Sequence, residues 1–319
     1  DSPDLGTQVG IWAKQEGVDA LNRIRTPRSW KGILKYHLPA AIFLAFIKTA
    51  LFRWLPSRRY WPPPDTTDGY VVIQSLSHVR SFSEPGEYRD AYFGPLLDYL
   101  AKSGQKTLVL AGIQEQPRAQ LKKLKNVHSG LPILPVESCV TFSNLVSGLF
   151  RTLRWYARFT QVTGKAEVDG LDVSFLVNRA VREARYSGTL FMNLLVFNAA
   201  KRLAETVQVN RWMYPFENLA WEKMLLMGAY SSSNDILMMG YQHASITKSN
   251  ATYQSIVLPE QQEQPMPFPK VVITTGNVTK QWLEAEGNYT AETKVRAACA
   301  LRPAFTPGSE PRPREPELS

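Results

Sequence analysis

Two short stretches of this sequence hold the side chains best suited to chemistry. Residues 214–222 read Tyr-Pro-Phe-Glu-Asn-Leu-Ala-Trp-Glu, and residues 240–244 read Gly-Tyr-Gln-His-Ala. A carboxylate such as Glu217 can take a proton from an attacking hydroxyl, and the imidazole of His243 can orient that carboxylate or contact a phosphate. The ring of Trp221, four residues after Glu217, could form a wall for a sugar ring. These residue types indicate acid–base chemistry on a polar substrate.

Ordinary structural roles explain the same residues. Glu217 and Asn218 can cap a helix, Trp221 can fill the core, and His243 can be a hydrogen-bonded side chain at the edge of a sheet. Residue spacing does not separate the structural interpretation from the catalytic one, so both stay open at this point.

Short apolar runs alternate with helical patterns through the centre of the chain. Strands are expected at 70–75, 107–111, 131–136, 207–214, 235–239, 270–276 and 294–301, and helices at 90–102, 117–125, 144–159, 173–185, 189–205, 219–227 and 278–286. This alternation predicts an α/β fold with a parallel, Rossmann-like sheet covered by helices. Glu217, Gln242 and His243 each follow a predicted strand. Because parallel strands end at one edge of a sheet, we expect these three side chains at the same edge.

Composition excludes several classes of protein. The chain has 319 residues and is 44% hydrophobic, so it can bury a large core and is not disordered throughout. Its two cysteines, Cys139 and Cys299, exclude a disulfide scaffold and an all-cysteine zinc site. No P-loop, G-x-G-x-x-G or G-x-S-x-G motif occurs, which argues against P-loop ATPases, ordinary dinucleotide dehydrogenases and α/β-hydrolases. The four histidines are widely scattered, and we expect no metal and no cofactor.

The positive charge is concentrated near the start of the chain. The net charge is +9, and ten basic residues against two acidic ones lie between Lys14 and Arg59. The apolar run 38–47 inside this stretch is about half the roughly 20 residues that a membrane-spanning helix needs. It suits a helix at the surface of an anionic membrane, or equally a helix packed on its own domain. The basic run 122–125 lacks aromatic residues for base stacking, so no nucleic-acid partner is expected.

Proline-rich segments divide the chain into four expected parts. These are a basic, apolar N-terminal segment (1–66), a Rossmann-like domain (67–262), the beginning of a second Rossmann-like domain (268–301) and a disordered proline-rich tail (302–319). The second domain is expected to be cut off after one strand–helix–strand unit, as in a truncated chain or a fragment. A cytoplasmic location is expected because no export signal stands at the start.

Several blocks of the sequence resemble a known family. Residues 69–78 (Gly-Tyr-Val-Val-Ile-Gln-Ser-Leu-Ser-His) and 90–100 are similar to the opening of bacterial surface carbohydrate biosynthesis proteins, which are related to GT-B glycosyltransferases. Residues 217–222, 240–243, 272–276 and 297–302 resemble later blocks of that family. The resemblance extends over residues 69–302.

The resemblance implies two Rossmann-like domains that face each other across a cleft. The first domain would bind a carbohydrate or lipid-linked acceptor, and the second a nucleotide-activated sugar, usually without a metal. The implied roles are catalytic for Glu217 and His243, substrate-binding for Gln242, Trp221, Asn218 and Glu222, and donor-binding for Thr274, Thr275 and Gly276.

The sequence thus predicts a GT-B-like glycosyltransferase, or a fragment of one, in surface polysaccharide or glycolipid biosynthesis. A lipid-linked acceptor would place it at the inner face of the cell membrane. Activity is expected of the full-length form, and the incomplete donor domain is a reason for this chain to lack it. The alternative is a non-catalytic membrane-surface binding or scaffold protein that keeps a Rossmann-like domain.

Overall fold

The computed structural model describes the chain in segments. These are residues 40–64, 68–82, 86–127, 130–158, 167–168, 171–172, 174, 177–178, 188–232, 235–244, 246, 253, 267–287, 289 and 292–301. The chain divides into two compact units, one of Asp1–Thr49 with Leu145–Met192 and one of Ala50–Asn144 with Asn193–Ser319. The predicted tail 302–319, most of the predicted helix 173–185 and most of the proline-rich stretch 259–269 lie outside the described residues.

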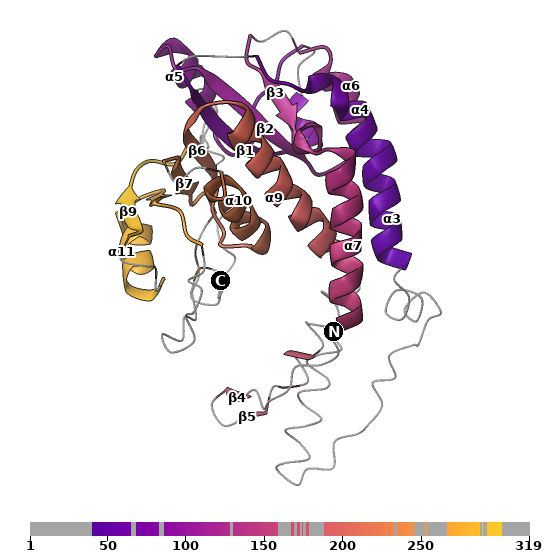
Figure 1. Cartoon of the computed structure of the whole chain (residues 1–319). Coiled ribbons are helices and arrows are strands. Elements are labelled where there is room, and N and C mark those ends of the chain that lie inside the picture. Colours follow the sequence, from indigo (N-terminus) through magenta and orange to yellow (C-terminus); the bar gives the residue numbers. More distant parts are fainter. Residues whose placement is uncertain are drawn as a thin grey trace, which may run out of the picture. The chain divides into compact units, whose positions relative to one another are not determined.

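A seven-stranded sheet forms the centre of the second unit. Its strands run in the order β3-β2-β1-β6-β7-β8-β9, and every neighbouring pair is parallel (Figure 1). The strands are β1 (Tyr70–Ser77), β2 (Thr107–Ile113), β3 (Ile133–Pro135), β6 (Val209–Pro215), β7 (Leu237–Tyr241), β8 (Val271–Thr274) and β9 (Lys294–Ala297). The predicted Rossmann-like parallel sheet is therefore confirmed.

Helices cover the two faces of this sheet from different parts of the chain. On one face lie α5 (Leu96–Lys102) and α6 (Pro117–Leu124), and the other carries α9 (Thr189–Thr206), α10 (Ala220–Tyr230) and α11 (Asn277–Glu286). Leu97 and Leu121 pack with Ile73 and Val109 in one buried cluster on the first face. Every residue of β1 except Leu76 is buried, and its first four residues, Tyr70 to Ile73, are apolar, as expected of a strand that is covered on both faces.

The strands β8 and β9 correct the expected division into two domains. Val271 pairs with Met239 of β7, and β9 pairs in turn with β8, so residues 271–297 extend the first sheet. The sequence of a strand–helix–strand unit is the same whether the unit starts a sheet or lengthens one. Within the described residues, the predicted second domain at 268–301 is therefore part of the first.

Several observed elements differ in length from the predicted ones. The helix expected at 90–102 begins only at Leu96, because the Asp90 side chain accepts the backbone N–H groups of Tyr92 and Phe93 and holds residues 91–95 in turns. The strand expected at 294–301 ends at Ala297.

The N-terminal segment does not form one separate part. Its described residues form α3 (Ala40–Thr49), a π-helical turn (Ala50–Trp54), α4 (Leu55–Ser57) and a 3-10 turn (Arg58–Tyr60). The unit that contains the sheet begins at Ala50, so residues 50–64 belong with the sheet and the expected boundary at 66 is wrong. Within the described ranges, no helix combines the length and hydropathy that a membrane crossing requires.

Two further elements complete the account. The helix α7 (Phe142–Arg158) matches the helix expected at 144–159, and the first unit contains a small antiparallel pair, β4 (Glu167–Val168) and β5 (Leu171–Asp172).

Candidate functional site

The strand order creates a topological switch point between β1 and β6. The helices that follow β1 and β2 lie on one face, and the helix that follows β6 lies on the other. Where connections leave a parallel sheet in opposite directions, the carboxyl ends of the strands are left open to a ligand. His78 follows β1 at this point, and Glu217 follows β6.

Glu217 and His243 lie together at this edge. The Nε2 atom of His243 is 3.3 Å from Oε1 of Glu217, and the side chains are 7% and 39% exposed, respectively. The two residues follow β6 and β7, whose parallel pairing brings Pro215 beside Tyr241. The expectation that they share one edge of the sheet is met, and Glu217 is the member that solvent reaches.

Two further residues extend this pair, and sequence analysis did not select them. The ring of Tyr92 meets the ring of His243 edge to face, with centroids 4.7 Å apart. The hydroxyl of Tyr92 is 3.1 Å from Nε2 of His78. We call Glu217, His243, Tyr92 and His78 the carboxyl-edge cluster. The cluster connects the ends of β1, β6 and β7 through the loop residue Tyr92.

The side chain of Glu222 holds the loop that carries Glu217. Oε1 of Glu222 accepts the backbone N–H of Glu217 and Oε2 of Glu222 accepts that of Asn218, each at 3.0 Å. Asn218 has a φ of +61°, a left-handed conformation that asparagine tolerates better than most residues. Glu222 is buried, so it does not present its carboxyl group to a ligand, and it supports the loop instead. The backbone of Asn218 forms the turn, and the substrate-binding role expected for its side chain stays a prediction.

Burial changes the ionisation of this supporting residue. The pKa of Glu222 is raised to about 8, because burial disfavours the carboxylate more than the backbone N–H groups of Glu217, Leu219 and Asn218 favour it. The adjacent Lys223 has a pKa lowered to about 8, again chiefly by burial. Its ammonium donates to the carbonyl of Pro267.

Gln242 and Thr274 are also structural in this arrangement. Gln242 is buried, donates through Nε2 to the carbonyl of Ala244, and accepts from Thr275 through Oε1. The hydroxyl of Thr274 donates to the carbonyl of Gly276 at 2.9 Å. These contacts connect the ends of β7 and β8. The donor-binding roles expected for 274–276 assumed a second domain, whereas these residues belong to the first sheet.

Trp221 does not join the cluster through any observed contact. Its ring packs at 6.2 Å, nearly perpendicular, against the buried ring of Tyr214. Trp221 itself is half-buried, so this packing agrees with the core role that the sequence left open, and the role as a sugar-binding wall stays a prediction.

A signal in the sequence could have identified His78. It follows a predicted strand directly, as Glu217 and His243 nearly do, so the same rule selects it. Tyr92 had no such signal. Its position depends on the turn that Asp90 organises by accepting two backbone N–H groups, at 2.8 and 2.9 Å.

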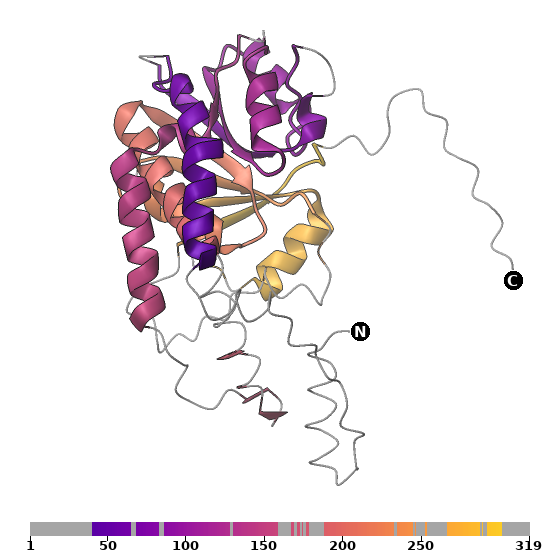
Figure 2. The same cartoon turned by 90° about the vertical axis from the view of Figure 1, so that its right-hand side faces the viewer.

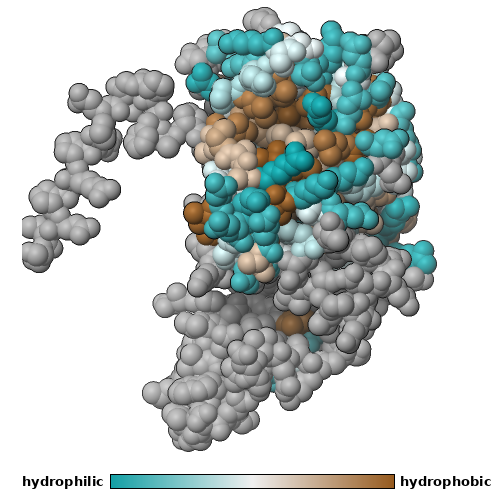
Figure 3. Space-filling view, turned by 90° about the vertical axis from the view of Figure 1, so that its left-hand side faces the viewer, coloured by the Kyte–Doolittle hydropathy of each residue, from teal (hydrophilic) through white to brown (hydrophobic). Residues whose placement is uncertain are grey.

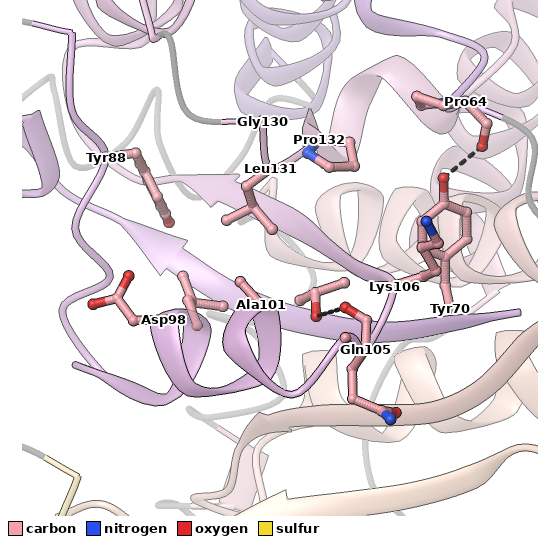
Figure 4. A pocket seen from close by; sticks show the side chains of 13 residues that line it. Pro64, Tyr70, Tyr88, Asp98, Ala101, Gln105, Lys106, Gly130, Leu131 and Pro132 are labelled. Atoms are coloured by element: carbon pink, nitrogen blue, oxygen red, sulfur yellow. Dashed lines mark hydrogen bonds between the residues drawn. The ribbon is translucent and has the colours of Figure 1, made fainter. Parts of the chain in front are cut away.

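Two open pockets lie elsewhere on the same unit. One of about 630 Å³ is at the amino edge of the sheet, where Tyr70 donates to the carbonyl of Pro64 and Asp98 and Lys106 supply the charges (Figure 4). The other, of about 560 Å³, lies against β7, β8 and β9, with Lys294 and Arg296 among its lining residues. Figure 3 views the side that carries β9 and α11, where apolar surface is bordered by hydrophilic side chains. Neither pocket includes Glu217 or His243.

Comparisons with known proteins add no assignment to this geometry. A scan against protein-family models and a search of curated proteins both give no match. Among the described residues, no group of three or more His, Cys, Asp or Glu side chains is placed to hold a metal ion.

Proposed function

We propose that the carboxyl-edge cluster is the acceptor side of a sugar-transfer site, in the manner of GT-B glycosyltransferases. One observation carries the proposal: an exposed carboxylate, Glu217, contacts an almost buried imidazole, His243, beside the switch point of a parallel sheet. Ligands of open parallel sheets bind at this kind of position.

In this proposal Glu217 is the general base. An acceptor hydroxyl gives its proton to the Glu217 carboxylate, its oxygen forms a bond to the anomeric carbon of the donor sugar, and the bond from that carbon to the nucleotide phosphate breaks. Nε2 of His243 lies 3.3 Å from Oε1 of Glu217, and when it carries the ring proton it donates to the carboxylate and fixes its direction. The ring of Tyr92 keeps the imidazole in place from the side. General-base catalysis of this kind contributes typically about 10²- to 10⁴-fold to a rate.

The partners in this proposal are a nucleotide-activated sugar and a carbohydrate or lipid-linked acceptor of surface polysaccharide or glycolipid synthesis. A lipid-linked acceptor places the reaction at the inner face of the cell membrane. The positive net charge of +9 is consistent with both phosphate-bearing partners.

Thermal unfolding in the presence of donors tests the proposal. The full chain is heated with UDP-, GDP-, CMP- and dTDP-linked sugars, each with and without a panel of short oligosaccharide acceptors. We expect at least one donor–acceptor combination to raise the unfolding temperature, because a ligand that binds only the folded state stabilises it.

A His243→Gln variant provides the site-specific comparison, and Lys102→Gln on the distant helix α5 provides the control. The stabilisation should weaken in the first variant and persist in the second. An unchanged unfolding temperature with every combination, or equal stabilisation in both variants, contradicts the proposal.

A further inference from the structure

The last three strands of the sheet carry an open hollow on one face. In Figures 1 and 2 the yellow helix α11 lies on the side of these strands that is turned away from α5 and α6. On the opposite face, the described residues of β7, β8 and β9 line a hollow of about 560 Å³. Parallel sheets are normally covered on both faces, so an open stretch of such a sheet is a place where a ligand can bind.

The floor of this hollow is apolar. Its side chains come from alternate positions of two neighbouring strands, Leu237 and Met239 of β7 and Val271 and Ile273 of β8. Alternate residues of a strand share one face, and Met239 pairs with Val271, so the four form one continuous surface. Ile273 also packs against the buried cluster beneath α5 and α6, which identifies the face. Leu237, Met239 and Ile273 are only half-buried, and their remaining surface is open to a ligand.

The outer wall of the hollow is positively charged. Lys294 and Arg296 are exposed and lie two positions apart on β9, so their side chains leave the same face of the strand about 7 Å from each other. Because β9 pairs with β8, these two cations stand directly beside the apolar floor. Lys270 and Glu292 also line the hollow. Three cations against one carboxylate leave a net charge of +2 (three minus one).

We propose that this hollow, which we call the β7–β9 pocket, binds a small phosphate ester with an apolar body. The apolar body lies on Met239 and Ile273, and the phosphate is held by Lys294 and Arg296. Arginine binds phosphate through two parallel N–H groups, and lysine adds a point charge. A phosphate monoester carries about two negative charges above pH 7, which matches the net charge of the pocket. The volume lies within the roughly 300–1,000 Å³ of small-molecule sites.

Other occupants fit the β7–β9 pocket less well. Inorganic phosphate would leave the apolar floor in contact with water, and a neutral apolar molecule would leave the cations without a counter-charge. A symmetric contact with a second copy of this chain would bring Lys294 and Arg296 against the same two cations, and like charges oppose such a contact.

This inference does not rest on sugar transfer. The pocket includes neither Glu217 nor His243, and the assay below contains no sugar nucleotide. Failure of the assay removes the β7–β9 pocket and leaves the transfer proposal standing, whereas failure of the donor screen leaves the pocket unaffected.

Isothermal titration calorimetry of the full chain with three probes tests the proposal. The probes are 2-naphthyl phosphate, its neutral counterpart 2-naphthol, and inorganic phosphate. We expect the Kd of 2-naphthyl phosphate to be at least about tenfold lower than that of either other probe, because only this probe meets both the apolar floor and the cations.

Two variants separate the contributions of the wall and the floor. The double variant Lys294→Gln/Arg296→Gln should bind 2-naphthyl phosphate about 30-fold more weakly, since each hydrogen bond to a charged group contributes several-fold or more to affinity. Its affinity for 2-naphthol should not change. Met239→Gln keeps the length of the side chain but places an amide on the floor. It should bind 2-naphthyl phosphate about fivefold more weakly, because apolar contact area is lost, and its affinity for inorganic phosphate should not change.

Matched controls change the same types of side chain elsewhere. Lys102→Gln/Lys122→Gln removes two exposed cations of α5 and α6, and Met227→Gln alters an exposed methionine of α10. Both controls should bind 2-naphthyl phosphate like the wild type. Hydrogen exchange of wild-type residues 294–298 gives a readout that needs no variant, and exchange should slow when 2-naphthyl phosphate is added.

Three outcomes overturn the proposal. The first is a Kd of 2-naphthyl phosphate equal to that of inorganic phosphate or 2-naphthol, or no binding of any probe. The second is wild-type affinity in the Lys294→Gln/Arg296→Gln variant, or equal losses in the control variants. The third is unchanged exchange of residues 294–298 at a saturating concentration of 2-naphthyl phosphate.

Discussion

The Glu222→Gln variant gives the sharpest test of how the site is supported. The carboxyl of Glu222 has a pKa raised from 4.5 to about 8 in the folded protein. Between these two pH values the folded state therefore binds more protons than the unfolded state. The contribution of Glu222 to the free energy of unfolding is complete below pH 4.5 and is lost as the pH rises through 8. At about 1.4 kcal/mol per pH unit, the interval corresponds to a loss of up to about 5 kcal/mol.

The variant removes this pH dependence. Glutamine does not titrate. Its amide oxygen can accept one of the two loop N–H groups, from Glu217 or Asn218, but its NH₂ group cannot accept the other, whereas the hydroxyl oxygen of the neutral Glu222 carboxyl still can. The lost hydrogen bond costs about 1 kcal/mol. We therefore expect the variant to be about 1 kcal/mol less stable than the wild type near pH 5 and up to about 4 kcal/mol more stable near pH 9, so that the two stability curves cross.

Urea unfolding at a series of pH values measures both curves. The neighbouring Lys223 also titrates near 8, but it is present in both proteins and cancels in their difference to a first approximation. Glu284→Gln on α11 is the control, because that side chain is 47% exposed and forms a surface ion pair with Lys280. Its curve should stay within about 0.5 kcal/mol of the wild type at every pH. A constant difference between Glu222→Gln and the wild type across the series would refute the reasoning.

Two further substitutions test the packing behind the site. In Gly228→Ala the new Cβ would lie 2.3 Å from the carbonyl oxygen of Phe197, so α9 and α10 must separate. We expect the free energy of unfolding, measured in urea, to fall by about 2 kcal/mol, and unchanged stability would contradict the observed contact. Arg53→Met leaves the Glu137 carboxylate, 5% exposed, without its cation and removes the donor to the Ile113 carbonyl, which should cost about 3 kcal/mol. A loss below about 0.5 kcal/mol would mean that this pair does not hold residues 50–60 onto the sheet.

The parallel sheet could be predicted because each strand is encoded by a short, local run of residues. An apolar run such as 107–111 must be buried on both faces, and its alternation with helical segments leaves little choice but a parallel arrangement. The meeting of Glu217 and His243 followed from the same rule, since strand ends in such a sheet share one edge. These inferences needed no knowledge of distant contacts.

Features that depend on tertiary contacts could not be predicted. The sequence does not reveal that Glu222 is buried beneath the loop while Glu217 reaches solvent, because the two glutamates lie only five positions apart in the same stretch. The place of β8 depends on its pairing with Met239, which no local pattern encodes. Tyr92 reaches His243 only because Asp90 delays the start of α5.

The rate of nucleotide release from sugar donors tests the central claim most directly. Wild type, Glu217→Gln and a control, Glu286→Gln, are compared with the donor and acceptor that give the largest thermal shift. If Glu217 is the general base of the carboxyl-edge cluster, the Glu217→Gln rate should fall by about 10²- to 10⁴-fold, while its thermal unfolding stays near that of the wild type and the control keeps its activity. A Glu217→Gln rate equal to that of the wild type, or no nucleotide release by the wild type with any donor, would contradict the claim.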